Sequence, residues 1–75
     1  TLETSVYPNP ATETLNVYAD SKEKIEKVGV YDLSGKLLLE SANTTINCKS
    51  LNAGIYIIEV SAKSGLKGFS RFIKQ

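Results

Sequence analysis

The sequence lacks histidine, methionine and tryptophan, and it contains only one cysteine and two prolines. The lack of histidine removes the commonest general base and the commonest metal ligand, and it excludes any triad with a histidine base. Cys48 has no second cysteine in the chain with which to form a disulfide. Because methionine is absent, Thr1 is not the natural start of translation. We therefore expect residues 1–75 to be one domain of a longer protein.

Charge and hydrophobicity exclude two further classes of partner. The formal net charge is +1, which creates no field that would attract a nucleic acid or an anionic membrane. No apolar run approaches the roughly 20 residues that a membrane-spanning helix needs. We therefore expect no nucleic-acid partner and no membrane insertion.

Motifs that carry catalysis are also missing. The segment Gly65-Leu66-Lys67-Gly68 lacks the spacing and the Lys-Ser/Thr pair of a phosphate-binding loop. The eight acidic residues are scattered along the chain, and a pocket needs more than acids. These observations predict a domain that is not an enzyme and that binds no cofactor or metal.

Short apolar segments, separated by turn signals, make up most of the chain. Strands at intervals of about 8–12 residues favour a sandwich or a barrel. We predict an all-β, immunoglobulin-like antiparallel β-sandwich of about seven short strands with Greek-key connections. Ser21 to Lys27 is too short for a helix that stands alone, so we expect a charged loop or a single helical turn there.

Alternation along the segments predicts which side chains face the core. The expected inward sets are Leu15 with Val17, Val28 with Val30, Leu37 with Leu39, Ile46 with Cys48, and Tyr56 with Ile58 and Val60. The last segment, Leu66 to Lys74, has Phe69 and Ile73 on one face and Phe72 on the other. The pattern therefore does not show which face of this segment points toward the core.

Two stretches predict local geometry. Asp32-Leu33-Ser34-Gly35 is typical of a tight turn, in which the aspartate caps the turn and the glycine adopts a positive φ. It predicts a hairpin that joins Val28–Tyr31 to Lys36–Leu39. Gly54 followed by Tyr56 is typical of a tyrosine corner, in which the phenol donates a hydrogen bond to upstream backbone. A simple core aromatic at Tyr56 is the alternative.

Cys48 and the basic residues near the C-terminus each allow two interpretations. Cys48 lies on an apolar face, which favours a buried small hydrophobe over a reactive thiol. Lys63, Lys67, Arg71 and Lys74 occur where acids are few. They form either a solvated edge strand or a contact surface for a partner that grips the C-terminus.

Four motifs in order give the sequence a family resemblance. They are Val6-Tyr7-Pro8-Asn9-Pro10, Tyr31-Asp32-Leu33-Ser34-Gly35-Lys36, Leu51-Asn52-Ala53-Gly54-Ile55-Tyr56, and the basic, apolar Arg71-Phe72-Ile73-Lys74-Gln75. This series resembles type A C-terminal sorting domains of the type IX secretion system, also called the Por system. The matching sorting-motif residues are Pro8, Asn9, Pro10, Gly35, Gly54, Tyr56 and Lys74.

The resemblance implies a secretion and sorting signal. Such domains direct a cargo protein of Bacteroidetes-type bacteria through the periplasm and across the outer membrane, to be secreted or held at the cell surface. The implied partners are the type IX machinery and a sortase-like cysteine protease that removes the domain, and a strand-exchanged homodimer is a further expectation. If the resemblance holds, the reading frame should end at or beside Gln75. The alternative is a fibronectin-III-like accessory binding module of a secreted enzyme, which would be expected to have a core tryptophan and about 90–100 residues.

Overall fold

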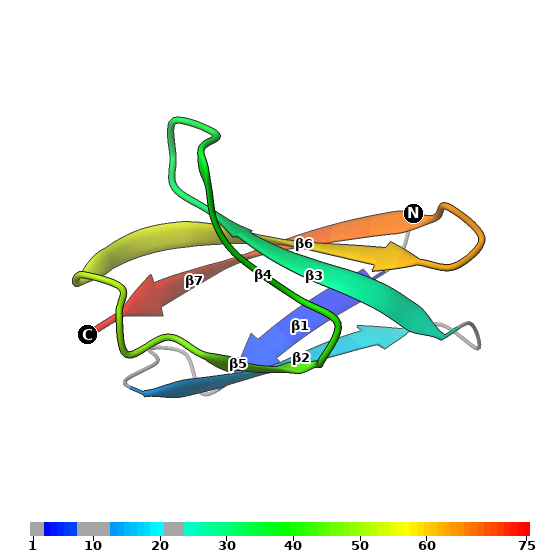
Figure 1. The fold of residues 1–75 in the computed structure, drawn as a ribbon, viewed down its shortest axis with the longest axis horizontal. Helices are drawn as coiled ribbons and strands as arrows, with labels where there is room; N and C mark the ends of the chain where they lie inside the picture. Colours follow the sequence, from blue (N-terminus) through cyan, green and yellow to red (C-terminus); the bar gives the residue numbers. More distant parts are fainter. Residues whose placement is uncertain (1–2, 8–12, 21–23) are drawn as a thin grey trace.

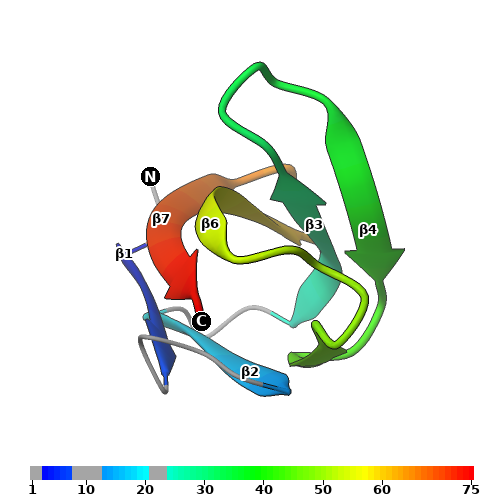
Figure 2. The same ribbon diagram turned by 90° about the vertical axis from the view of Figure 1, so that its left-hand side faces the viewer.

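The computed structural model describes residues 3–7, 13–20 and 24–75, and all of its regular structure is β-strand. The strands are β1 (Glu3–Tyr7), β2 (Thr14–Asp20), β3 (Ile25–Tyr31), β4 (Leu37–Ser41), β5 (Thr45–Asn47), β6 (Gly54–Ala62) and β7 (Lys67–Lys74). A three-stranded sheet has the order β1-β2-β5, and a four-stranded sheet has the order β4-β3-β6-β7. The two sheets form the layers of a sandwich (Figures 1 and 2).

All pairings between strands are antiparallel, and the chain crosses between the sheets three times. Hairpins join β1 to β2, β3 to β4 and β6 to β7, while the connections β2–β3, β4–β5 and β5–β6 pass from one layer to the other. This is a Greek-key connectivity, and the prediction of an immunoglobulin-like sandwich of about seven strands is confirmed. The described part of the chain has no helix long and apolar enough to cross a membrane.

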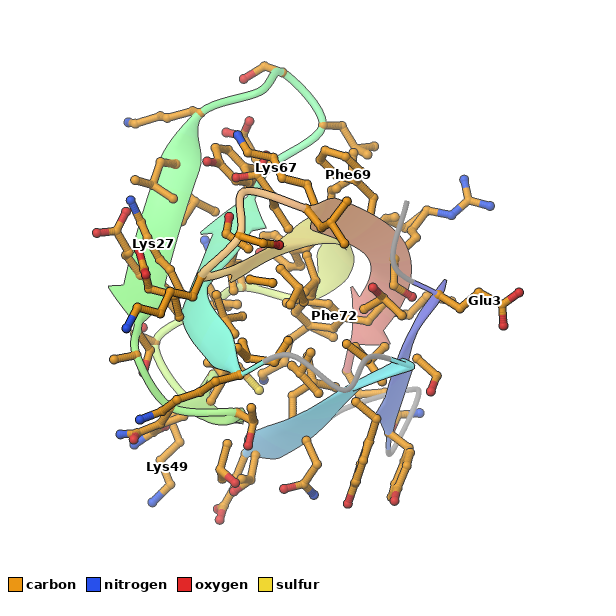
Figure 3. All side chains as sticks on the ribbon, turned by 90° about the vertical axis from the view of Figure 1, so that its right-hand side faces the viewer. Glu3, Lys27, Lys49, Lys67, Phe69 and Phe72 are labelled. Carbon is orange, nitrogen blue, oxygen red and sulfur yellow. The ribbon has the colours of Figure 1, made fainter. Side chains whose placement is uncertain are left out.

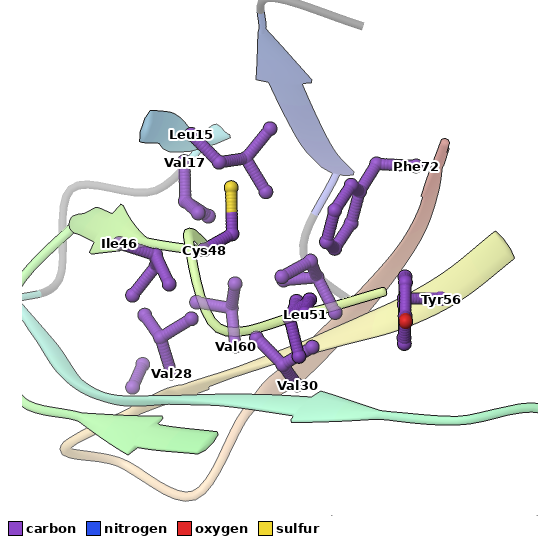
Figure 4. Close-up of a cluster of buried hydrophobic side chains, with 12 residues drawn as sticks. Leu15, Val17, Val28, Val30, Ile46, Cys48, Leu51, Tyr56, Val60 and Phe72 are labelled. Atoms are coloured by element: carbon purple, nitrogen blue, oxygen red, sulfur yellow. The ribbon is translucent and has the colours of Figure 1, made fainter. Parts of the chain in front are cut away.

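The core lies between the two layers, and most of its side chains are those expected from alternation. Leu15 from β2, Val28 and Val30 from β3, and Ile58 and Val60 from β6 are fully buried. Figure 4 shows buried side chains from both sheets meeting between the layers, with the sulfur of Cys48 pointing toward Leu15. Such interlocking branched side chains give a small domain most of its hydrophobic stabilisation.

Pairing with β6 determines which side of β7 faces inward. Tyr56 is opposite Phe72 in the register, and Phe72 is fully buried between the layers. Phe69 and Ile73 face away from the core and stay about half exposed. Figure 3 shows Phe72 inside the sandwich and Phe69 on the opposite face of the strand.

The charged loop expected at Ser21 to Lys27 is wrong for its last three residues, which begin β3. Ser21 to Glu23 lie outside the described residues. The pairing of β3 with β6 shifts register between Ile25 and Lys27, and this irregularity lets Ile25 pack against the core although Val28 is only three positions away. Lys27 instead forms an ion pair on the outer face with Glu40, with 3.0 Å between Nζ and Oε2.

The shared inward face expected for Leu37 and Leu39 is also wrong. The register between β3 and β4 shifts at Val30/Tyr31, so that Leu39 is opposite Val30 and Leu37 is opposite Tyr31. Leu38 and Leu39 both pack against the core cluster, while Leu37 is exposed. A bulge of this kind breaks the period of two on which the prediction depended.

Candidate functional site

The sorting-motif residues that the structure describes lie at one end of the sandwich. Gly54 begins β6 and is opposite Lys74 at the end of β7, so both chain segments reach the same end. The turn that contains Gly35 follows Tyr31, which is opposite Ile57, and therefore extends from that end as well. Figure 1 shows the hairpin, the start of β6 and the C-terminus together there. We call Gly35, Gly54, Tyr56 and Lys74 the signature residues; Pro8, Asn9 and Pro10 lie outside the described residues.

Asp32 organises the predicted hairpin turn. Its Oδ1 accepts hydrogen bonds from the hydroxyl of Ser34 at 2.6 Å, the amide of Ser34 at 2.9 Å and the amide of Lys36 at 3.0 Å. These bonds favour the ionised carboxylate, the Ser34 hydroxyl most strongly, and hold the pKa of Asp32 below its ordinary value. The amide of Gly35 donates to the carbonyl of Asp32, and Gly35 has a φ of 91°, a conformation that other residues rarely adopt.

Tyr56 forms the predicted corner. Its hydroxyl donates a 2.6 Å hydrogen bond to the backbone carbonyl of Asn52, four residues upstream. Its ring is buried and lies 5.5 Å from the ring of Phe72, measured between centroids. Tyr56 therefore ties the crossover from β5 to the start of β6 and supports the end of β7, which places it in the structural role described for sandwiches of this kind.

The basic residues near the C-terminus do not form one cluster. Lys67 and Arg71 point outward from β7, and Lys63 is exposed in the turn before it. Lys74 faces the other way and is 9% exposed, and its Nζ donates to the carbonyl of Gln75 at 2.9 Å. The structure therefore separates the inward Lys74 from the outward cations.

Cys48 is fully buried, as favoured from the sequence, and it follows β5 instead of lying within a strand. Its amide donates to the carbonyl of Glu13 at 2.9 Å, which fixes the start of β2 against the end of β5. Within the described ranges, no three residues of the metal-binding types come close enough to hold an ion. Of the signature residues, Gly35 sets a positive φ in the hairpin turn and Tyr56 binds upstream backbone, so both fix the path of the chain at this end.

One feature of this end was missed from the sequence. Leu33 at the hairpin tip and Phe69 on β7 are both well exposed, and they line a common hollow on the outer face of the four-stranded sheet. The sequence feature that could have indicated this hollow is Leu33, an apolar residue in an otherwise polar turn. Proximity of residues 33 and 69 depends on pairing between β3, β6 and β7, which alternation does not reveal.

The strand order, the three crossings and the tyrosine corner define a small Greek-key β-sandwich. Comparison with known families assigns it: residues 5–75 match the secretion system C-terminal sorting domain, and the chain belongs to that family. A curated relative, β-agarase D of Zobellia galactanivorans, is 37% identical over 62 residues. That alignment covers 80% of this chain and 12% of the agarase.

Family membership establishes the kind of signal that the domain carries. It is a C-terminal sorting signal of the type IX secretion system, a class of domain that is generally non-catalytic. The signal implies interaction with the type IX machinery and marks its protein for transport across the outer membrane, to the cell surface or the extracellular space. The match favours this role over that of an accessory binding module.

Proposed function

We propose that the type IX machinery recognises the folded domain through strand β7, and that a sortase-like cysteine protease afterwards removes the domain from its cargo. The observation that carries the first part is the position of β7. It is one of the two edge strands of its sheet, it ends beside the signature residues, and it exposes Lys67, Phe69, Arg71 and Ile73 in alternation. An edge strand offers both backbone groups and side chains to a partner.

In this proposal the sorting-motif residues act through the backbone. Tyr56 is occupied by its bond to Asn52, Gly35 sets the hairpin angle, and Gly54 pairs with Lys74. We propose the same backbone role for Pro8, Asn9 and Pro10, because proline fixes φ and restricts the residue before it. The partner then meets the outward side chains of β7 and not the motif residues themselves.

The test is a fusion of this chain, at the C-terminus of a periplasm-directed reporter, in a host with an active type IX system. Deletion of residues 71–75 should abolish secretion, but it also removes Phe72 from the core. Arg71→Gln with Ile73→Ser changes only outward positions, and we expect it to lower secretion at least about 10-fold while circular dichroism stays native. Tyr18→Ser, on the outer face of the other sheet, is the matched control. Equal secretion by the control and the β7 variant would refute recognition through β7.

Removal by the protease has a separate readout. In the same host, the secreted reporter should be smaller than the fusion by the mass of the domain. In a host whose sortase-like protease is inactivated, the fusion should keep the domain. A reporter that retains the domain when the protease is active would contradict removal without affecting the argument for recognition.

We also propose that two copies can exchange β1. This strand has five residues, pairs with β2 at the edge of its sheet and also contacts β7. An exchanged β1 would make the same contacts with the second copy as it makes here.

A further inference from the structure

Exposed apolar side chains are concentrated on the outer face of the four-stranded sheet. Leu37, Ile55, Phe69 and Ile73 project from four positions on this face, and Leu33 lies at the hairpin beside it. Leu33 is 64% exposed and Phe69 is 58% exposed. Contiguous exposed apolar surface on a small domain marks an interaction site.

The hairpin turns this face into a hollow. The β3–β4 hairpin rises away from the sheet, as Figure 2 shows, and the space between hairpin and sheet measures about 360 Å³. Four apolar or aromatic residues line it, together with two acids: Tyr31, Leu33, Ile57, Phe69, Asp32 and Glu59. Its volume is within the range of roughly 300–1,000 Å³ that is usual for ligand sites.

Gly29 leaves room for one aromatic wall of the hollow. A Cβ at this position would lie 3.1 Å from Cε1 of Tyr31 and 3.3 Å from Cδ1 of Leu37. The ring of Tyr31 therefore lies over bare backbone, packed against a neighbouring leucine.

The charge of the lining is acidic. Asp32 and Glu59 contribute two carboxylates, and the described lining residues include no lysine or arginine. Hydrogen bonds within the turn favour the ionised form of Asp32. The nearby Lys27 forms its ion pair with Glu40 and also interacts electrostatically with Glu59, while Lys36 interacts with Asp32. Aromatic walls with a carboxylate at the rim are the surroundings that suit a cationic side chain with an apolar stem.

We propose that this hollow binds an arginine side chain presented by an extended segment of a protein partner. Its planar guanidinium stacks on Tyr31 and Phe69 and pairs with the carboxylate of Glu59, while its methylenes contact Leu33 and Ile57. Arginine suits this site better than lysine because it can stack and bond in two directions at once. The hollow shares Phe69 with the outer face of β7, but it includes neither Arg71 nor Ile73, the two positions changed in the test of recognition through β7.

The test is an NMR titration of the ¹⁵N-labelled 75-residue chain with the peptide acetyl-Ala-Arg-Ala-amide at up to millimolar concentration. We expect the largest amide shifts at Leu33, Ile57 and Phe69. The same peptide with citrulline, which has the shape of arginine without its charge, should bind at least about 10-fold more weakly. Shifts spread over the whole surface, or equal binding of the citrulline or lysine peptide, would overturn the proposal.

Two variants assign the binding to the hollow. Glu59→Gln should weaken binding of the arginine peptide at least about 10-fold, and Phe69→Ser should weaken it similarly through loss of stacking. Glu3→Gln removes an equal charge from the other sheet, where Figure 3 shows Glu3 far from Phe69, and should leave binding unchanged. Binding by Glu59→Gln as strong as that of the wild type, with native peak dispersion, would contradict the assignment.

Discussion

At the scale of single residues, the most specific interaction is the hydrogen bond from Tyr56 to the carbonyl of Asn52. Tyr56→Phe keeps the ring against Phe72 and removes only this bond, so unfolding free energy should fall by about 0.5–1.5 kcal/mol. Urea denaturation with an unchanged m-value measures the difference. Tyr31→Phe, which removes a phenol oxygen from the outer face, is the matched control. An equal effect in both variants would show that the corner bond adds no stability.

Asp32 predicts a pH dependence of stability. Its native pKa is lowered chiefly by the Ser34 hydroxyl, while in the unfolded chain it titrates near about 3.9. Its contribution to stability should therefore be complete above about pH 5 and disappear as pH falls through the lower native pKa. Comparison of the wild type with Asp32→Asn by urea denaturation from pH 2 to 6 tests this. The difference between the two should shrink toward low pH, and a difference that grows there would contradict the predicted sign.

Because the thiol of Cys48 is buried, we expect it to react slowly with thiol reagents. A reagent reaches this sulfur only when the end of β5 separates from β2, because the residue is fully buried. Labelling with a disulfide reagent in the native state should be at least about 100-fold slower than in urea-unfolded chain. Labelling at the unfolded rate would mean that this corner of the core opens freely.

At the scale of elements, β7 presents two phenylalanines with opposite roles. Phe72 fills the core opposite Tyr56, and its replacement by alanine should lower unfolding free energy by about 3–5 kcal/mol. Phe69→Ala, three positions earlier on the outer face, should change it by less than about 0.5 kcal/mol. Thermal and urea unfolding of both variants test this, and similar losses would indicate that the register of β7 is different.

The same strand shows where prediction from the sequence stops. Alternation identified β2 correctly because one of its faces is clearly apolar. It also identified β6, whose start is apolar on both faces, because Glu59 and Ser61 mark the outer side of that strand. Both faces of β7 are apolar, since its outer face carries Phe69 and Ile73, so the pattern could not choose between them. Only pairing with β6 resolves the choice, and pairing is a property of the folded chain.

Bulges account for the other errors. The strand at Ile25–Lys27 and the outward position of Leu37 both follow from register shifts in β3 and its partners. A single extra residue reverses the face of every later side chain, and the sequence has no glycine or proline at either bulge to signal it. By contrast, the Asp32–Gly35 turn and the Tyr56 corner were predictable because their chemistry is local in sequence.

At the scale of the whole molecule, the chain is as compact as its length allows. The radius of gyration is 11.3 Å, equal to the roughly 11 Å expected for a compact chain of this length. The family signature extends over residues 5–75, so its motifs are distributed across both sheets. Recognition of this family from the sequence therefore depended on the order of several weak motifs. The fold brings the described signature residues of these motifs to one end of the sandwich.

The proposal that two copies exchange β1 can be tested with a disulfide between β1 and β2. Ser5 is opposite Tyr18 across β1 and β2, so Ser5→Cys with Tyr18→Cys, in a Cys48→Ala background, places two thiols within reach of a disulfide. In a monomer this disulfide is intrachain, whereas in an exchanged dimer it joins two copies. We expect sedimentation to detect a dimer that increases with protein concentration. We also expect the oxidised dimer fraction to remain a dimer on a non-reducing gel.

Each single variant, Ser5→Cys or Tyr18→Cys, controls for random crosslinking, because neither has an opposing thiol in the β1–β2 pair. Sedimentation that shows only monomer at every concentration would refute exchange. A dimer fraction that separates into monomers on the non-reducing gel would refute it too, because its β1 would then pair with the β2 of its own chain. The gel therefore distinguishes exchange of β1 from association through the apolar outer face of the other sheet, which leaves every strand in place.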